Sequence, residues 1–198
     1  MLGIGDQGPR LRLPSLTGPE VGLEDYRGRK NVVVWFTKGF ACVFCRRQMI
    51  QMRRDYPRIQ ALDAEILEVT PTRPDRARVY AAHFPVPFPY LLDPPHSAWP
   101  AWGLGRRSHG PGYYVKGLLS AVKMEQPPAS EVGAAKPSLA EIPGLLADDD
   151  MGLFVVDRDG IVRYAMAGSY DTVEDGRHQT RSLPSTAEIL RVLESCRR

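Results

Sequence analysis

Two of the three cysteines of this 198-residue chain stand three positions apart, at Cys42 and Cys45. They lie between an apolar run and a basic, amphipathic stretch, in the segment WFTKGFACVFCRRQMIQM that covers residues 35–52. Four interpretations fit such a pair: a redox-active dithiol, half of a metal site, a structural disulfide, or two buried apolar side chains. Each interpretation needs different surroundings, so the rest of the sequence weighs them differently.

A metal site is disfavoured because the chain offers no second pair of ligands. Structural zinc takes four ligands, usually as two spaced pairs. The third cysteine, Cys196, stands two residues from the end, where an incidental exposed thiol is the favoured interpretation and a distant resolving cysteine the alternative. The histidines are isolated from one another: His83, His96, His109 and His178. We therefore predict neither a metal nor another cofactor.

The redox interpretation follows from the elements expected around the pair. Residues 31–37, NVVVWFT, predict a central strand buried on both faces. Apolar residues at helical spacing between 49 and 62 predict a helix that begins near Cys42. The first turn of a helix has unpaired N–H donors and a partial positive charge, which stabilise a thiolate. We expect Cys42 to be the exposed, attacking thiolate, and Cys45, one turn on, to lie deeper and close the disulfide.

Elsewhere, strands and helices alternate along the chain. The sequence predicts a strand at 64–70, then a helix that follows the turn at 72–75 and ends near residue 84. The proline-rich stretch 85–95 predicts an extended segment at the edge of a sheet. The Asp-Gly turn within 157–160 predicts a hairpin. This order predicts an α/β fold with a mixed central sheet flanked by helices.

Three further features complete the prediction of one domain. Ser185 and Glu188 predict the capping box of a terminal helix. Pro57 falls inside the first helical pattern and should kink that helix or start a second segment, because its ring removes a backbone donor. Residues 106–150 predict an insertion, partly helical, before the final hairpin. We expect residues 1–198 to form a single domain that carries this insertion.

Composition excludes several classes of function. The formal net charge is only +3 and the basic residues are scattered, so nucleic acid is not a predicted partner. No apolar stretch reaches the roughly 18 residues of a membrane span, and no basic start followed by an apolar core marks a signal peptide. We therefore expect a cytoplasmic protein that does not enter membranes and whose thiols are reduced by default.

The motifs also resemble a known family. GDQGPRLRLPSLTGPEVGLEDYRGRKNVVVWF and FTKGFACVFCRRQM are similar to the opening and the cysteine motif of the peroxiredoxin-like branch of the alkyl hydroperoxide reductase/thiol-specific antioxidant superfamily. LLDPPHSAWPAWGL resembles a middle segment of that superfamily, and GLFVVDRDGIVRYAMAG resembles its closing hairpin. The resemblance covers about residues 3–105 and 151–195.

The chain departs from the family pattern at positions near the thiols. Gly39 stands where typical peroxiredoxins have a Thr that helps to hold the peroxide. Met151 and Gly152 stand where thioredoxins have a cis-Pro and typical peroxiredoxins an Arg. Positive charge beside Cys42 would then come from other residues, and the candidates are Lys38, Arg46 and Arg47.

The resemblance implies a thioredoxin fold and a thiol-dependent oxidoreductase, a peroxiredoxin-like peroxidase that uses Cys42 and Cys45 as a redox pair. The substrate would be a peroxide or a disulfide, and the reductant a thioredoxin-like protein or a low-molecular-weight thiol. Two alternatives stay open. The protein could be a general thiol–disulfide oxidoreductase without peroxidase activity, or a non-catalytic thioredoxin-fold protein that senses redox state. The sequence gives no indication of the oligomeric state.

Overall fold

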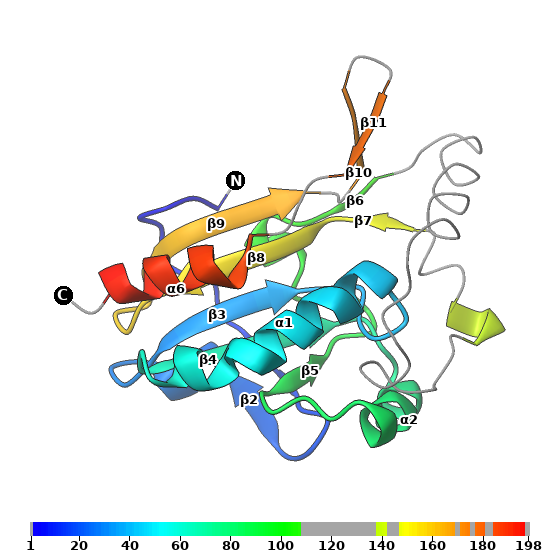
Figure 1. The fold of residues 1–198 in the computed structure, drawn as a ribbon, viewed down its shortest axis with the longest axis horizontal. Helices are drawn as coiled ribbons and strands as arrows, with labels where there is room; N and C mark the ends of the chain where they lie inside the picture. The colour runs from blue at the N-terminus through cyan, green and yellow to red at the C-terminus, as the bar shows by residue number, and fades with distance from the viewer. Residues whose placement is uncertain are drawn as a thin grey trace.

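A five-stranded mixed sheet forms the centre of the molecule. The structure is a computed structural model that describes residues 2–107, 138–141, 147–168, 171–174, 177–180 and 184–196. In spatial order the strands of the sheet are β5 (Tyr90–Leu92), β4 (Ala64–Thr70), β3 (Asn31–Phe36), β8 (Met151–Val156) and β9 (Val162–Gly168). The first three are parallel to one another, while β8 is antiparallel to β3 and to β9 (Figure 1). The predicted α/β fold with a mixed sheet is confirmed.

The two central strands are buried along their whole length. All six residues of β3 and all seven of β4 are buried. Their parallel register runs from Asn31 beside Ala64 to Phe36 beside Val69. A strand that is covered on both faces can be a continuous apolar run, which is why both strands were predicted with nearly the observed bounds. Two charged residues of β4, Glu65 and Glu68, are not explained by this pattern, and both are buried.

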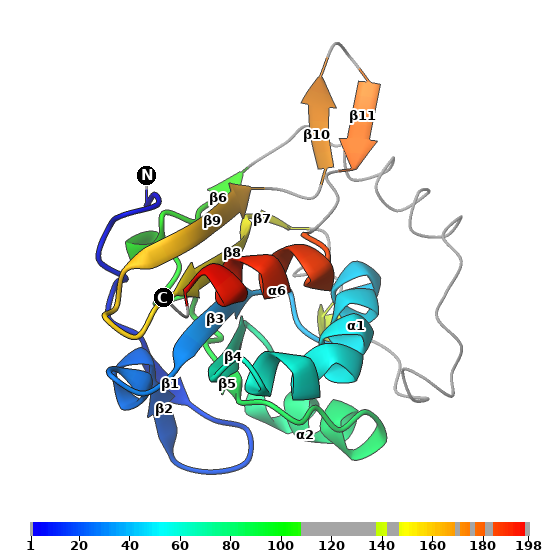
Figure 2. The ribbon, with the colours of Figure 1, turned by 60° about the vertical axis from the view of Figure 1, so that its left-hand side comes forward.

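Two apolar clusters lie on opposite faces of the sheet. One face carries α1 (Val43–Gln60), α2 (Pro74–His83) and α6 (Thr186–Ser195), which pack against strand residues such as Trp35. The N-terminal segment and η2 (Pro100–Trp102) cover the other face. Figures 1 and 2 show α1 and α6 side by side over the first face, where the two helices are in contact. The cysteine motif begins α1, so the thiols belong to this helical side.

The first helix continues through its proline. α1 spans 18 residues without division, so the alternative in which Pro57 starts a second segment is wrong. Pro57 lies close to the end of the helix, and the backbone N–H of Ala61 still donates to its carbonyl at 3.0 Å. Within the part of the chain that the structure describes, no helix is both long enough and apolar enough to cross a membrane.

The predicted hairpin and terminal helix are both present at the C-terminal side. β8 and β9 flank the turn at 157–160. The hydroxyl of Ser185 accepts a hydrogen bond from the backbone N–H of Glu188 at 3.2 Å, which caps α6. The Glu188 carboxylate accepts a hydrogen bond from the Tyr164 hydroxyl of β9 at 3.1 Å. The N-cap half of the predicted capping box is confirmed, and the Glu188 side chain expected to complete it ties the helix to the sheet.

The predicted insertion at 106–150 lies mostly outside the described residues, and so does most of its predicted helical content. Its two ends pair with each other, because β6 (Arg106–Arg107) and β7 (Asp148–Asp149) form a short antiparallel ladder. Between them the structure describes one turn of helix, η3 (Leu139–Glu141). The residues that precede and follow the segment between β6 and β7 are therefore neighbours in space.

Two short hairpins lie outside the predicted elements. Near the N-terminus, β1 (Arg12–Pro14) pairs with β2 (Glu20–Gly22), which leads into η1 (Leu23–Tyr26). After β9, β10 (Asp171–Glu174) pairs with β11 (Arg177–Thr180). Strands of three or four residues are too short to show an alternation of apolar and polar positions, so sequence periodicity does not predict them.

Candidate active site

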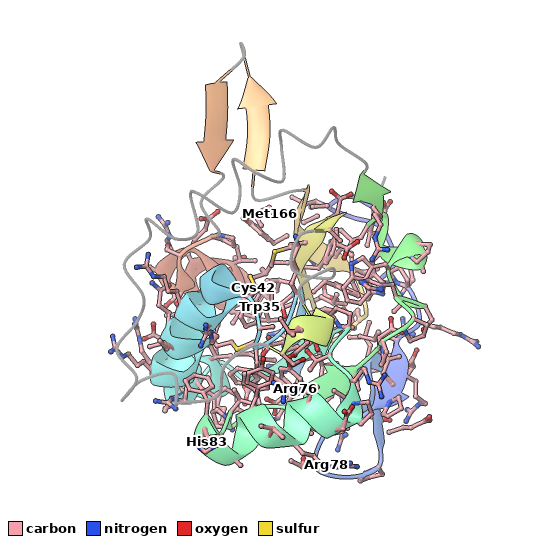
Figure 3. The ribbon with its side chains drawn as sticks, turned by 90° about the vertical axis from the view of Figure 1, so that its right-hand side faces the viewer. Trp35, Cys42, Arg76, Arg78, His83 and Met166 are labelled. Atoms are coloured by element: carbon pink, nitrogen blue, oxygen red, sulfur yellow. The ribbon has the colours of Figure 1, made fainter. Side chains whose placement is uncertain are left out.

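Cys42 stands at the N-terminus of α1 and receives a backbone hydrogen bond (Figure 3). Its backbone is extended, with φ −83° and ψ 121°, as expected of an N-cap residue. Its Sγ accepts a hydrogen bond from the backbone N–H of Cys45 at 3.3 Å. The backbone N–H of Cys42 in turn donates to the carbonyl of Gly39 at 3.1 Å. The sulfur of Cys42 thus lies at the positive end of the helix, where a thiolate is stabilised.

Both thiols are buried, and Cys45 is the deeper of the two. Cys45 has no exposed surface, whereas 7% of Cys42 is exposed. The deeper position predicted for Cys45 is confirmed, but the prediction that Cys42 is exposed is wrong. Its sulfur turns back over the first turn of α1, toward the amide of Cys45, so that solvent reaches little of it. Both cysteines are free thiols in this structure.

The environment of Cys45 favours the protonated thiol. Burial raises the pKa of Cys45 well above its usual value, and a hydrogen bond with Cys42 and the charge of Cys42 raise it further. A thiol with a raised pKa is a weak nucleophile near neutral pH. It becomes a nucleophile only after it gives up its proton. The two cysteines therefore lie in different environments, Cys42 at the N-terminus of α1 and Cys45 in the interior.

The three cations expected near Cys42 occupy different environments. Arg46, one helical turn further along α1, has only 8% of its surface exposed. Its buried Nε has no hydrogen-bond partner among the residues that the structure describes. Arg47 is exposed, and Lys38 donates from its ammonium group to the carbonyl of Ala147. Arg46 is therefore the cation among the three whose charge is least screened by water.

Gly39 is required both by its backbone conformation and by a hydroxyl group that lies against it. Its φ is +75°. A Cβ at this position would lie 2.1 Å from Oγ1 of Thr72 and 2.9 Å from Oη of Tyr90. The Thr that typical peroxiredoxins carry here does not fit this backbone. Instead, the Thr72 hydroxyl, 3.2 Å from that of Tyr90, occupies the space beside the cysteine motif.

A cavity of about 220 Å³ opens beside the motif. Its walls are largely polar and charged, and they include Lys38, Ala41, Thr72, Arg76, His96 and Asp149. Ala41 is the residue before Cys42, so the cavity adjoins the candidate nucleophile. A larger cavity of about 520 Å³ is lined by Val32 and Asp157, at the other end of β3 and β8, and is not part of this site.

Cys196 is far from the cysteine pair. It is the C-cap residue of α6 and is half-buried, and burial raises the pKa of its thiol. The charged groups that act on it are Asp157 and Arg163, which lie at one end of β8. The other end of β8 pairs with Phe36, beside the cysteine motif. The described residues contain no group of three His, Cys, Asp or Glu side chains that could hold a metal ion.

Sequence reasoning identified the two cysteines but missed three polar residues around them: Thr72, Tyr90 and Glu68. Thr72 and Tyr90 carry no local signal, because they come from the chain after β4 and from β5. Glu68 did carry a signal. A glutamate in the middle of the predicted buried strand AEILEVT has to be either paired or neutral, and such a residue is a candidate for function.

The fold and the cysteine pair define a class of protein, the thioredoxin-fold proteins with two thiols at the start of the first main helix. The solved structure of peroxidoxin BcpB from Mycobacterium tuberculosis has the same fold, with a TM-score of 0.62 at 15% identity. The match covers 100% of this chain and 97% of that chain. Residues 4–165 match the model of the AhpC/TSA family, and the chain belongs to this family.

The similar proteins include an alkyl hydroperoxide reductase and a thiol–disulfide oxidoreductase. Alkyl hydroperoxide reductase E of Mycobacterium tuberculosis is 27% identical over 184 residues, which are 92% of this chain and 97% of the relative. Thiol-disulfide oxidoreductase ResA of Geobacillus thermodenitrificans is 34% identical over 105 residues, which are 52% of this chain and 59% of ResA. The predicted family and the predicted thioredoxin-like fold are confirmed.

Proposed function

We propose that this protein is a thiol-dependent peroxidase in which Cys42 is the attacking thiolate and Cys45 the resolving thiol. The observation that carries the proposal is the hydrogen bond from the backbone N–H of Cys45 to Sγ of Cys42 at the N-terminus of α1. The thiolate is the nucleophile in reactions with peroxides and disulfides, and this position favours it. The buried charge of Arg46 supports the same assignment.

The proposed cycle has an oxidative and a reductive half. The Cys42 thiolate attacks one oxygen of a hydroperoxide, the O–O bond breaks, and the other oxygen leaves as an alcohol or water after taking a proton. Cys42 becomes a sulfenic acid. Sγ of Cys45 then loses its proton and attacks this sulfur, the S–O bond breaks, and water leaves as the disulfide forms. An external thiol reduces the disulfide and completes the cycle.

The cavity beside Ala41 supports a small hydroperoxide as the oxidant. Its volume of about 220 Å³ fits a small molecule, and Lys38, Thr72 and Arg76 give it polar walls. The likeness to alkyl hydroperoxide reductase E over 92% of this chain points in the same direction. A thioredoxin-like protein or a low-molecular-weight thiol would be the reductant.

The second candidate function is general thiol–disulfide exchange. It is favoured by the likeness to ResA and by Gly39, which leaves the motif without the Thr of typical peroxiredoxins. In this function the same two cysteines would exchange with a disulfide, and no sulfenic acid would form. For either function we propose the cytoplasm as the compartment, because external thiols are abundant there. Both also fit one domain over residues 1–198 with an insertion at 106–150.

Peroxide consumption at the expense of a thiol tests the proposal. The reduced protein is mixed with hydrogen peroxide or an organic hydroperoxide in the presence of thioredoxin, thioredoxin reductase and NADPH, and the reduction of insulin disulfides is measured in parallel. We expect turnover of peroxide by the wild-type protein and by Cys196→Ser, which is the matched control. Cys42→Ser should lose activity by more than about 100-fold, because the nucleophile is gone.

The remaining outcomes separate the candidates. Cys45→Ser should react once and stop, with Cys42 trapped as a sulfenic acid or a mixed disulfide. Reduction of insulin without consumption of peroxide would replace the proposal by the second candidate. A wild-type protein that does neither, but forms the disulfide reversibly, would be a redox sensor.

A further inference from the structure

Glu68 is a carboxylic acid enclosed in the same buried layer as the two thiols. It has no exposed surface. Side chains alternate along a strand, so Glu68 points to the same side of the sheet as Ile66, which packs under the helices. Its register partners on the neighbouring strands are Trp35 and Tyr90. Ile66, Trp35 and Tyr90 all belong to the cluster that contains both cysteines.

Within the described part of the chain, one carboxyl oxygen of Glu68 accepts a hydrogen bond and the other does not, so the second oxygen can carry a proton. The Thr37 hydroxyl accepts a hydrogen bond from the backbone N–H of Gly39 at 3.0 Å, and it donates to Oε1 of Glu68 at 3.0 Å. Oε2 is buried and has no hydrogen-bond partner within the described part of the chain. A bare anionic oxygen in such a place is costly, so the acid is stable only with its proton on Oε2.

The surroundings of Glu68 on balance favour its protonated form. Burial raises its pKa well above the usual value, the hydrogen bond from Thr37 lowers it, and the charge of Cys42 raises it. The other titratable groups that face it are Cys45 from α1 and Tyr90 from β5. Among the residues that the structure describes, the groups that act on Glu68 include no basic side chain. It is therefore a neutral acid beside the thiol pair in the resting protein.

The reduction of the disulfide needs a proton inside this layer. When an external thiolate attacks Cys42, Cys45 leaves as a thiolate, and its position has no contact with solvent. We propose that Glu68 donates the proton that converts this thiolate to the thiol. The inference deepens the proposed function and rests on it, since it assigns a proton donor to the reductive half of the same cycle.

The step is balanced without a further reactant beyond an external dithiol. Its first thiol ionises and bonds to Sγ of Cys42, while the disulfide breaks with its electron pair on Sγ of Cys45. The proton on Oε2 of Glu68 moves to that sulfur and leaves a carboxylate. The second thiol of the reductant then loses its proton to solvent, displaces Cys42 as a thiolate and forms the reductant's own disulfide. Glu68 regains a proton from solvent, which received one from the first thiol.

Single-turnover reduction of the preformed disulfide tests the inference apart from any peroxidase activity. The wild-type protein and the variants Glu68→Gln and Glu68→Asp are oxidised with diamide, freed of oxidant, and mixed with dithiothreitol. Reaction is stopped with an alkylating agent, and free thiols are counted by mass spectrometry. Near pH 7 we expect Glu68→Gln to be reduced roughly 10- to 100-fold more slowly than wild type, with Glu68→Asp between them.

The pH profile separates proton donation from a structural effect. Rates are divided by the fraction of dithiothreitol present as thiolate. The wild-type rate should then fall as pH rises and Glu68 ionises, whereas the Glu68→Gln rate should not change. Glu65→Gln is the control, since Glu65 is a buried carboxyl of the same strand that is bonded to Tyr56 and Lys30. It should be reduced within about twofold of the wild-type rate.

Three results would overturn the inference. The first is a Glu68→Gln rate within twofold of wild type with the same pH profile. The second is a normalised wild-type rate that stays constant as pH rises, which also decides the case if the variants fold poorly. The third is a wild-type protein that forms no disulfide between Cys42 and Cys45, and that result would overturn the proposed function at the same time.

Discussion

The turn from Gly39 to Cys42 sets the position of the candidate nucleophile through a left-handed backbone conformation. With φ at +75°, Gly39 directs its carbonyl to accept the backbone N–H of Cys42. Thr72 then approaches so closely that a Cβ at position 39 would overlap its hydroxyl. The left-handed backbone and the close approach of Thr72 both require glycine at position 39. Each should contribute separately to the loss of stability when Gly39 is replaced.

We predict that Gly39→Ala lowers the free energy of unfolding by about 2–4 kcal/mol, from the left-handed backbone and the overlap with Thr72 together. Urea denaturation measures this. In the double variant Gly39→Ala, Thr72→Ala the overlap with the hydroxyl is absent, so about 1–2 kcal/mol of the loss should be recovered relative to the sum of the single variants. Purely additive single effects would mean that the contact with Thr72 costs nothing.

The sequence predicts the site at this scale only where the chemistry is local. Cys42 and Cys45 were recognisable because their spacing and the elements beside them lie within one short segment. The burial of Cys42 was not predictable, because it depends on how the first turn of α1 packs against the rest of the fold. Thr72 and Tyr90 reach the motif through the pairing of β3 with β4 and of β4 with β5, which are contacts between distant parts of the sequence.

At the scale of elements, Asp149 of β7 binds residues of the chain that lie in and before β6. Its carboxylate accepts a hydrogen bond from Nε of Arg106 at 2.6 Å and lies 3.4 Å from Nε2 of His96. Burial raises the pKa of Asp149, but the contact with His96 and the hydrogen bonds and charge of Arg106 outweigh burial and hold the pKa well below its usual value. The ladder of β6 and β7 is therefore stabilised by an ionised carboxylate.

We predict that Asp149→Asn lowers the free energy of unfolding by about 1–3 kcal/mol near pH 7, since the ion pairs are lost. The folded-state pKa is depressed, so this stability is present above the unfolded-state pKa and is lost as pH falls through the folded-state pKa. The difference between variant and wild type should therefore narrow below about pH 4. Denaturation curves at several pH values measure it.

Asp75→Asn is the control for this prediction, because Asp75 forms an exposed pair with Arg73. Exposed pairs contribute little, so we expect a smaller loss of stability for Asp75→Asn than for Asp149→Asn. A difference for Asp149→Asn that stays constant from neutral to acidic pH would show that ionisation of Asp149 does not stabilise the ladder.

Elements were predictable in proportion to their length and regularity. The strand at 64–70 has the predicted bounds, and the helix after it, the hairpin around 157–160 and the Ser185 cap were all found. The hairpins of β1 with β2 and β10 with β11 were not predicted, because short strands show no periodicity. The continuity of α1 through Pro57 was also not predictable, since it depends on how close the proline lies to the end of the helix.

For the whole molecule, the buried acid in the central sheet makes stability depend on pH. The folded-state pKa of Glu68 is raised, so its stabilising contribution is complete below the unfolded-state pKa and is lost as pH rises through the folded-state pKa. We predict that Glu68→Gln gains stability relative to wild type as pH rises from about 5 to 9, by at most about 1.4 kcal/mol per pH unit. Urea denaturation of both proteins measures the difference, and a constant difference would show that Glu68 is ionised in the fold.

The placement of the three cysteines also belongs to this scale. Cys196 lies near the far end of β8, and a strand of that length separates it from the motif by roughly 17 Å. We predict that one equivalent of peroxide joins Cys42 to Cys45 and leaves Cys196 free. Alkylation followed by peptide mapping identifies the linkage. A link between Cys42 and Cys196, or a stable sulfinic acid at Cys42 beside a free Cys45, would contradict the two-cysteine cycle.

The three tryptophans lie on different faces of the sheet, so the fluorescence of one of them should depend on the redox state of the cysteines. Trp35 lies in the cluster of the two cysteines (Figure 3), whereas Trp99 and Trp102 lie on the opposite face. A disulfide quenches the fluorescence of an indole close to it, so oxidation should dim the emission of Trp35 and leave that of the other two unchanged. Emission spectra of Trp35→Phe should therefore be the same in both redox states, while those of Trp102→Phe should still differ. The redox state could then be followed in real time without any added dye.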